Sequence, residues 1–269
     1  EKGGSVLRML EQYLGDTPYR DGIRNYLTKH SYGNTETNDL WDAIEETTGQ
    51  PARRIMDSWI YQGGYPVVSV ETVGQTTLRL SQRRFRFVDD PEGANSRWSV
   101  PVILRVNGES QRVLLEDGDF DVELDGPVES VIVNAGGHGF YRVRYSPELL
   151  AKIDPAEGDL SAIERYMLID DAWASVVAGN TAASDFVAFA RGFADETDAE
   201  VWSQLTGCLT ALDRLLEGEG RDAMRTIVRE LVSPALDRIG WEPSEGQSAR
   251  DLELRGTLIR SLAITGNDQ

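Results

Sequence analysis

The sequence predicts an α+β fold in three parts: helices over residues 1–65, an antiparallel β-sandwich over 66–146 and a helical array over 147–269. The first observation is the spacing of apolar residues, which changes from helical to alternating at Val67 and returns to helical after Pro147. The second is the length of 269 residues, which is more than one ordinary hydrophobic core serves and therefore indicates two or three domains.

The first part is predicted to contain four short helices with apolar inner faces. Gly15 is expected to close the first helix in a left-handed conformation, and Thr17-Pro18 to start the second. Thr37 is expected to cap the third, with Asp39 in its first turn, and Gly63-Gly64 to end the fourth. The apolar stripes are Val6, Met9, Leu10, Tyr13 and Leu14; Tyr19, Ile23, Tyr26 and Leu27; Leu40, Trp41 and Ile44; and Ile55, Met56, Trp59 and Ile60.

The second part alternates apolar and polar residues over about seven short strands separated by turn residues, which is typical of a small antiparallel sandwich. Asn107-Gly108 is a strong signal for a two-residue hairpin loop between two of these strands. An open sheet has the same signature. The strands are expected at 67–73, 78–80, 100–106, 111–115, 120–124, 131–133 and 140–145.

The third part returns to helical spacing. Ser161 and Glu164 form a capping box that predicts a helix through Val177, and Ser184 is expected to cap the next helix. A later helix is expected to kink or stop near Pro234. Successive helices of this length predict a solenoid-like array, and because no C-terminal cap is evident, a truncated one. Further apolar stripes run over residues 186–193, 201–216, 224–232 and 252–262, with Leu215 and Leu252 among their members.

The composition excludes some functions. The net charge of −18, from 27 basic and 45 acidic residues, repels phosphate backbones and argues against nucleic-acid binding. No apolar stretch approaches the roughly 20 residues of a membrane span, and no secretory signal is evident. Cys208 is the single cysteine, so it forms no internal disulfide and is predicted to be a buried thiol. These features predict a cytoplasmic protein that binds no membrane.

The two histidines do not form a metal motif. A zinc-binding helix of the His-Glu-x-x-His type needs histidines four residues apart, whereas His30 and His138 are 108 apart in different predicted domains. His30 is expected at a helix end. His138 lies in the glycine-rich turn Gly136-Gly137-His138-Gly139, which does not open a helix and therefore lacks the context of a phosphate site.

Acidic and basic clusters also favour structural roles. Asp117, Asp119 and Asp121 have the spacing of a calcium loop but lack its glycine and its bidentate glutamate, which favours the solvent-facing side of a strand. Glu45-Glu46 are adjacent on a helix and so do not face one another. The cluster Arg83-Arg84-Phe85-Arg86-Phe87 has the aromatic interleaving of a single-strand binder, but on a strongly acidic chain a sheet edge protected by cations is favoured. The sequence therefore predicts no catalytic and no metal-binding residues, and leaves substrate-binding residues unknown.

Five segments, in order, resemble zinc aminopeptidases of the aminopeptidase N and puromycin-sensitive type, which belong to the gluzincins. The match is close in order and spacing from residue 2 to about 180, and looser to the end. The segments are Lys2-Gly3-Gly4 with the residues to Leu10; Asn34 with Thr37, Asp39, Leu40 and Trp41; Met56, Trp59, Gln62 and Gly64-Tyr65-Pro66; Asn134 with Gly139-Phe140-Tyr141-Arg142-Val143 and Tyr145; and Ile163, Arg165, Leu168 and Asp171.

The resemblance implies the end of a thermolysin-like catalytic domain, a β-sandwich and the start of an ERAP-like helical superhelix. It implies a parent enzyme that removes N-terminal residues from peptides with a zinc ion. Lys2-Gly3 correspond to the end of the family's Tyr-x-Lys-Gly signature, so its tyrosine and all zinc ligands would precede Glu1. The chain alone is therefore expected to be inactive, to hold no cofactor and to frame the substrate cavity of the parent.

Two further expectations follow. The alternative function is a non-catalytic scaffold or peptide-binding module with the same architecture, and an upstream reading frame encoding His-Glu-x-x-His would argue against it. Without a catalytic core, Trp41, Ile55, Trp59 and Ile60 are expected to form an uncovered apolar patch that promotes pairing between copies.

Overall fold

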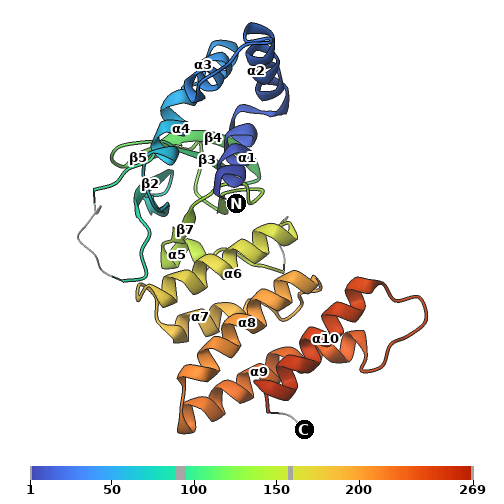
Figure 1. Ribbon diagram of the computed structural model, residues 1–269. Coiled ribbons are helices and arrows are strands. Elements are labelled where there is room, and N and C mark those ends of the chain that lie inside the picture. Colours follow the sequence, from blue (N-terminus) through green and yellow to red (C-terminus); the bar gives the residue numbers. More distant parts are fainter. Residues whose placement is uncertain (1, 89–94, 157–159, 268–269) are drawn as a thin grey trace. The chain divides into compact units, whose positions relative to one another are not determined.

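The computed structural model describes residues 2–88, 95–156 and 160–267. The chain divides into two compact units, Glu1–Ile153 and Asp154–Gln269 (Figure 1). Each unit has a hydrophobic core of its own. Helices and sheets are both present, as an α+β chain requires. The finer division into domains at 1–65, 66–146 and 147–269 stays a prediction.

The first unit begins with the four predicted helices. Gly15, with φ of 93°, ends the first of them in a conformation that favours glycine. The second and third helices pack so closely that a Cβ on Gly22 would lie 3.0 Å from the Cα of Ile44. The helices are α1 (Lys2–Leu14), α2 (Asp16–Lys29), α3 (Thr37–Thr48) and α4 (Ala52–Ile60).

In the described part of the first unit, seven strands form two sheets. The four-stranded sheet has the order β5-β2-β1-β7, and the three-stranded sheet the order β4-β3-β6. Most neighbours are antiparallel as predicted, but β1 and β7 pair in parallel, with Val68 opposite Val143. The prediction of a purely antiparallel arrangement is therefore wrong. The strands are β1 (Pro66–Val73), β2 (Thr77–Arg84), β3 (Val100–Val106), β4 (Glu109–Leu115), β5 (Phe120–Glu123), β6 (Val131–Val133) and β7 (Arg142–Tyr145), followed by the short helix α5 (Pro147–Leu150).

The predicted hairpin loop at Asn107-Gly108 is confirmed. Both residues have positive φ, 49° and 86°, which is the conformation of a type I′ turn between β3 and β4. The Asn107 side chain is fixed in place: its Oδ1 accepts hydrogen bonds from the backbone N–H groups of Glu129 and Ser130, and its Nδ2 donates to the Pro127 carbonyl. The turn is thus tied to the loop before β6.

The expected apolar patch on the first four helices is wrong for three of its four residues. Trp41, Ile55 and Trp59 are 4%, 0% and 1% exposed, because they belong to the same core as the inward residues of both sheets. Only Ile60 is exposed, at 45%. The strands that follow in the chain cover the helical face, so the surface expected to promote pairing between copies is absent.

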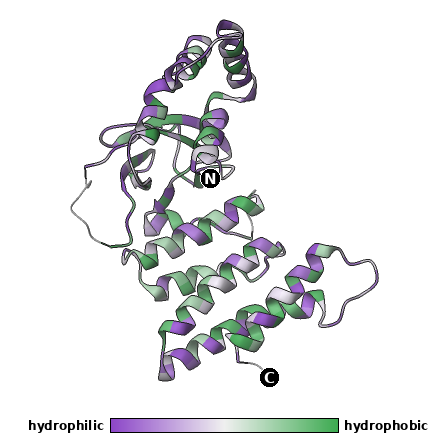
Figure 2. Ribbon diagram, viewed as in Figure 1, coloured by the Kyte–Doolittle hydropathy of each residue, from purple (hydrophilic) through white to green (hydrophobic). Residues whose placement is uncertain are grey.

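The second unit consists of helices whose hydrophobic and hydrophilic residues alternate along each element (Figure 2). Helix α8 contacts both α6 and α10, and α9 packs against α8 and α10, as in a helical array. The helices are α6 (Ala162–Val177), α7 (Ala183–Ala190), the 3₁₀ turn η1 (Arg191–Phe193), α8 (Ala199–Leu215), α9 (Gly218–Ile239) and α10 (Ala249–Ile264).

Several predicted helix boundaries differ in the structure. Helix α2 begins at Asp16, before Thr17-Pro18, and α4 ends at Ile60, before Gly63-Gly64. The residue before α3 is Glu36, not Thr37, because the Asp39 carboxylate accepts the Glu36 N–H at 2.8 Å. Helix α7 already begins at Ala183, so Ser184 lies in its first turn. Helix α9 does not stop at Pro234 but continues to Ile239, since buried neighbours on both sides of the proline pack against the core; the kink stays a prediction. The capping box of Ser161 at the start of α6 is confirmed.

The apolar stripes are correct at their centres and wrong at their margins. Leu27, Leu215 and Leu252 are 61%, 77% and 48% exposed. Each lies in the first or last turn of its helix. Among the described residues, no helix has the length and apolar character needed to cross a membrane.

Candidate functional site

The two histidines lie on separate elements. His30 follows the last residue of α2, where its ring lies 5.5 Å from that of Tyr26. His138 lies in the turn between β6 and β7. Throughout the described ranges 2–88, 95–156 and 160–267, no three histidine, cysteine, aspartate or glutamate side chains are grouped so as to hold a metal ion.

The turn that carries His138 is held by hydrogen bonds between its own residues. Asn134 has a φ of 64°, and its Oδ1 accepts the Gly139 N–H at 2.7 Å. A Cβ on Gly136 would lie 2.8 Å from His138 Nε2, so the imidazole lies directly over that glycine. A Cβ on Gly139 would lie 2.2 Å from the Tyr141 ring. The glycines therefore serve close packing within the turn.

The three predicted solvent-facing aspartates divide between a turn and a strand. Asp121 lies on β5, where both its carboxylate oxygens accept hydrogen bonds from Arg79 on β2 at 2.8 Å. These bonds lower the pKa of Asp121 below its ordinary value. Asp117 and Asp119 precede the strand, so for them the prediction of a strand position is wrong.

Glu45 and Glu46 diverge as predicted. Glu45 accepts the backbone N–H of Arg53 at 3.2 Å, whereas Glu46 pairs with Lys29 at 3.2 Å. The bond to Lys29, followed by one from Asn25, lowers the pKa of Glu46. The two carboxylates thus do not form an acid–base pair.

The basic and aromatic cluster does not lie on an edge strand. Arg83 and Arg84 end β2, which lies between β5 and β1. However, β5 pairs only with residues 77–80 of β2. Arg83 and Arg84 therefore lie beyond the part of β2 that β5 covers. The Phe85 ring stacks on Tyr65 at 5.5 Å and meets Phe87 edge-on at 4.9 Å. The aromatic side chains therefore pack on one another at the end of the sheet.

Cys208 is buried in α8, as predicted. Burial, together with the charge of Asp170, raises the pKa of its thiol to about 12. The thiol is therefore protonated at neutral pH, which excludes it as a nucleophile and as a metal ligand in this state.

We expect the folded protein to react with a disulfide reagent at pH 8 roughly a thousand times more slowly than the protein in urea. A thiol of ordinary pKa, about 8.5, is roughly a quarter thiolate at that pH, whereas the buried thiol is about 0.01% thiolate. The measurement is the rate of coloured thiolate release with Ellman's reagent. Rapid stoichiometric labelling of the folded chain would contradict the buried, protonated state.

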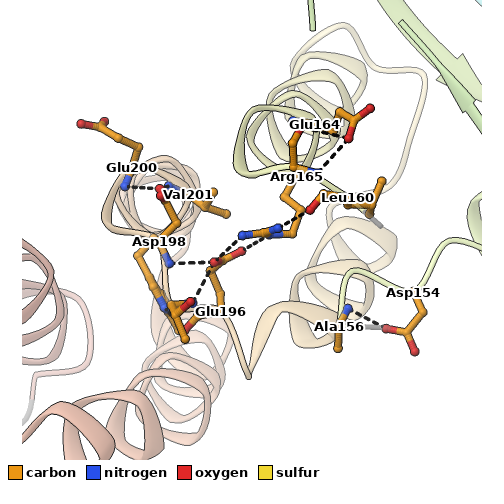
Figure 3. A network of polar contacts seen from close by, with 12 residues as sticks. Asp154, Ala156, Leu160, Glu164, Arg165, Glu196, Asp198, Glu200 and Val201 are labelled. Atoms are coloured by element: carbon orange, nitrogen blue, oxygen red, sulfur yellow. Dashed lines mark hydrogen bonds and ion pairs between the residues drawn. The ribbon is translucent and has the colours of Figure 1, made fainter. Parts of the chain in front are cut away.

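A buried ion pair joins Arg165 on α6 to Glu196, which precedes α8 (Figure 3). Their side chains are 18% and 2% exposed. Two parallel bonds, of 2.5 and 3.0 Å, connect the guanidinium to the carboxylate. Arg165 also donates to the Leu160 carbonyl at 2.5 Å.

Glu196 is bound from its other side as well. Its Oε1 accepts the backbone N–H groups of Thr197 and Asp198, each at 2.7 Å, and its own carbonyl accepts from Trp202 Nε1. Asp198 in turn caps α8 by accepting from Glu200 and Val201 (Figure 3). Both carboxylate oxygens of Glu196 thus accept hydrogen bonds within the protein. The network connects α6 to the start of α8 and leaves the Glu196 carboxylate no free oxygen for a reaction.

Comparisons with known proteins define the class of this chain. Residues 1–59 match the Peptidase family M1 domain, and residues 130–269 match the ERAP1-like C-terminal domain. The second match alone covers more than half of the chain. The chain therefore belongs to the M1 family of peptidases with an ERAP1-like C-terminal domain, which confirms the resemblance seen in the sequence.

The relatives extend this match over nearly the whole chain. Tricorn protease-interacting factor F2 of Thermoplasma acidophilum is 33% identical over 98% of this chain and 32% of its own length. Aminopeptidase M1 of Arabidopsis thaliana is 31% identical over 100% and 33%. Aminopeptidase 2 of Candida albicans is 30% identical over 97% and 29%. The chain thus spans about a third of the length of the curated relatives it matches.

Proposed function

We propose that this chain is part of a zinc-dependent aminopeptidase that removes N-terminal residues from peptides, and that it does not perform the reaction alone. The supporting observation is that relatives named aminopeptidases align with 97–100% of this chain but extend to about three times its length. Zinc and the peptide substrate belong, in this proposal, to the whole enzyme.

Among the described residues, no group of side chains is suited to hold a zinc ion. A catalytic zinc takes three protein ligands and keeps a fourth position for water. His30 and His138 lie on different elements, no described group of three ligands exists, and Cys208 is protonated. No catalytic step is therefore assigned to any residue here.

The role that remains is structural. We propose that residues 1–65 complete a catalytic domain, that 66–146 form the sandwich, and that 147–269 begin a helical domain, so that together they frame the substrate cavity. The whole enzyme is proposed to work in the cytoplasm, because a reducing environment keeps a single unpaired cysteine in the thiol form. The acidic surface favours basic peptides near that cavity.

The test is an assay of the purified chain with leucine p-nitroanilide and added zinc. We expect no turnover above buffer, while a full-length M1 aminopeptidase in the same assay turns over. Turnover by the chain that EDTA abolishes would overturn the proposal. A reading frame upstream of Glu1 that encodes His-Glu-x-x-His would support it, whereas a start codon directly before Glu1 would favour a non-catalytic module.

A further inference from the structure

A polar groove of about 400 Å³ lies within the second unit, between α8 and α10. The sequence spacing explains it, because residues three, four and seven apart share one helix face. Opposite its leucine stripe, α8 presents small and hydroxyl-bearing residues, and α10 does the same. The hydroxyl groups that line the groove are those of Ser203, Thr206, Thr210, Thr257, Ser261 and Thr265.

One buried hydroxyl of this set has no hydrogen-bond partner among the described residues. Ser261 is 5% exposed, and its Oγ is buried without a partner among the described residues. By contrast, Thr206 donates to the Trp202 carbonyl at 2.8 Å, and Thr210 and Thr265 bond to each other at 2.8 Å. A buried polar group without a partner is destabilising, and such groups in folded proteins call for a ligand or water. The Ser261 hydroxyl therefore has unused hydrogen-bonding capacity in the wall of the groove.

The groove is positively charged on an acidic chain. Arg214 on α8 and Arg260 on α10 line it, and no acidic side chain does among the residues that the structure describes. Neither arginine has an ion pair or hydrogen bond within the described residues, whereas Arg221, close by in sequence, is bound by Asp213 at 2.9 and 3.1 Å. With a net charge of −18 over the whole chain, two unpaired arginines facing one cavity indicate an anion.

We propose that this groove binds a phosphate group, either free phosphate or a small phosphate monoester. The two arginines come from different helices, and the buried Ser261 lines the same groove. A tetrahedral oxyanion has three or four oxygens that accept from several directions at once, whereas a planar carboxylate has two in one plane. Ala211 and the exposed Ile264 supply an apolar wall for the organic part of an ester. The inference is independent of the proposed aminopeptidase function.

The test is isothermal titration of the 269-residue chain with inorganic phosphate, phenyl phosphate and benzoate at constant ionic strength. We expect saturable binding of one or both phosphates at one site, and binding of benzoate at least about tenfold weaker. The tighter of the two phosphates identifies the source as free or esterified. Arg214→Met and Arg260→Met are each expected to weaken binding about tenfold, since each removes a charge-assisted hydrogen bond.

Two further variants separate binding from folding. Arg250→Met makes the same charge change on α10 outside the groove, and is expected to leave phosphate affinity within about twofold. Ser261→Ala removes a hydroxyl that has no partner in the free chain, so thermal stability without phosphate is expected to be retained while phosphate affinity falls about threefold. Absence of saturable binding, equal affinity for benzoate, or equal losses in Arg250→Met and the groove variants would each overturn the proposal. If Arg214 only stabilised the C-terminal end of the α8 dipole, its replacement would lower stability without changing phosphate affinity. That result would also overturn the proposal.

Discussion

Replacing Arg165 by methionine is expected to lower the free energy of unfolding of the second unit by about 3–5 kcal/mol. The substitution keeps much of the side-chain volume but leaves the Glu196 carboxylate, 2% exposed, without its cation. The backbone bonds from Thr197 and Asp198 then have to stabilise a buried negative charge alone. Amide hydrogen exchange in α6 and α8 measures the effect in this unit specifically.

A matched control is Arg191→Met. Arg191 pairs with Glu230 at 3.2 Å, but both side chains are more than half exposed, so solvent screens the pair and the expected loss is below about 1 kcal/mol. A double variant, Arg165→Met with Glu196→Gln, is expected to lose less than the sum of the two single changes, because the two side chains act on one another. Similar losses of unfolding free energy in Arg165→Met and Arg191→Met would show that burial does not determine how much the Arg165–Glu196 pair contributes to stability.

Replacing Trp59 by alanine is expected to destabilise the first unit by about 3–5 kcal/mol. The indole is 1% exposed and lies 6.0 Å from the Trp98 ring and 6.2 Å from that of Phe140. Its Nε1 donates to the Ser99 carbonyl at 3.1 Å, so the variant loses a buried hydrogen bond as well as packing. Urea unfolding followed by circular dichroism measures the loss.

Phenylalanine variants separate the hydrogen bond from the packing. Trp59→Phe keeps an aromatic ring but leaves the Ser99 carbonyl without its donor, which costs about 1–3 kcal/mol. Trp98 is equally buried, yet its Nε1 has no partner among the described residues, so Trp98→Phe removes an unpaired donor and is expected to cost less. A larger loss in Trp98→Phe than in Trp59→Phe would contradict this assignment.

Features that depend on nearby residues were predictable from the sequence. The helix stripes, the Asn107-Gly108 turn and the Ser161 capping box each depend on residues within a few positions of one another, and the structure confirms them. The caps at Thr37 and Ser184 were misplaced because the helices begin one or two residues earlier than those hydroxyls require. Hydroxyl residues near a helix start indicate a cap but do not fix its position.

Features that join distant segments were not predictable. The parallel pairing of β1 with β7 brings together strands about 75 residues apart, and alternation alone does not encode direction. Arg165 and Glu196 are 31 residues apart, and neither has a local signal of burial. The burial of Trp41 and Trp59 was missed for the same reason, because the covering strands come later in the chain. The groove between α8 and α10 was not predictable either, because it is lined by residues of two helices that are distant in the sequence.

The way Asn107 is held bears on the chemical ageing of the protein. An asparagine before a glycine ordinarily deamidates readily, because the following backbone nitrogen attacks the side-chain amide to form a succinimide. Here that amide is held by the Pro127 carbonyl and by the N–H groups of Glu129 and Ser130, so it cannot turn toward the Gly108 nitrogen while the hairpin is folded. Conversion of this residue to aspartate or isoaspartate on storage therefore reports opening of the β3–β4 loop.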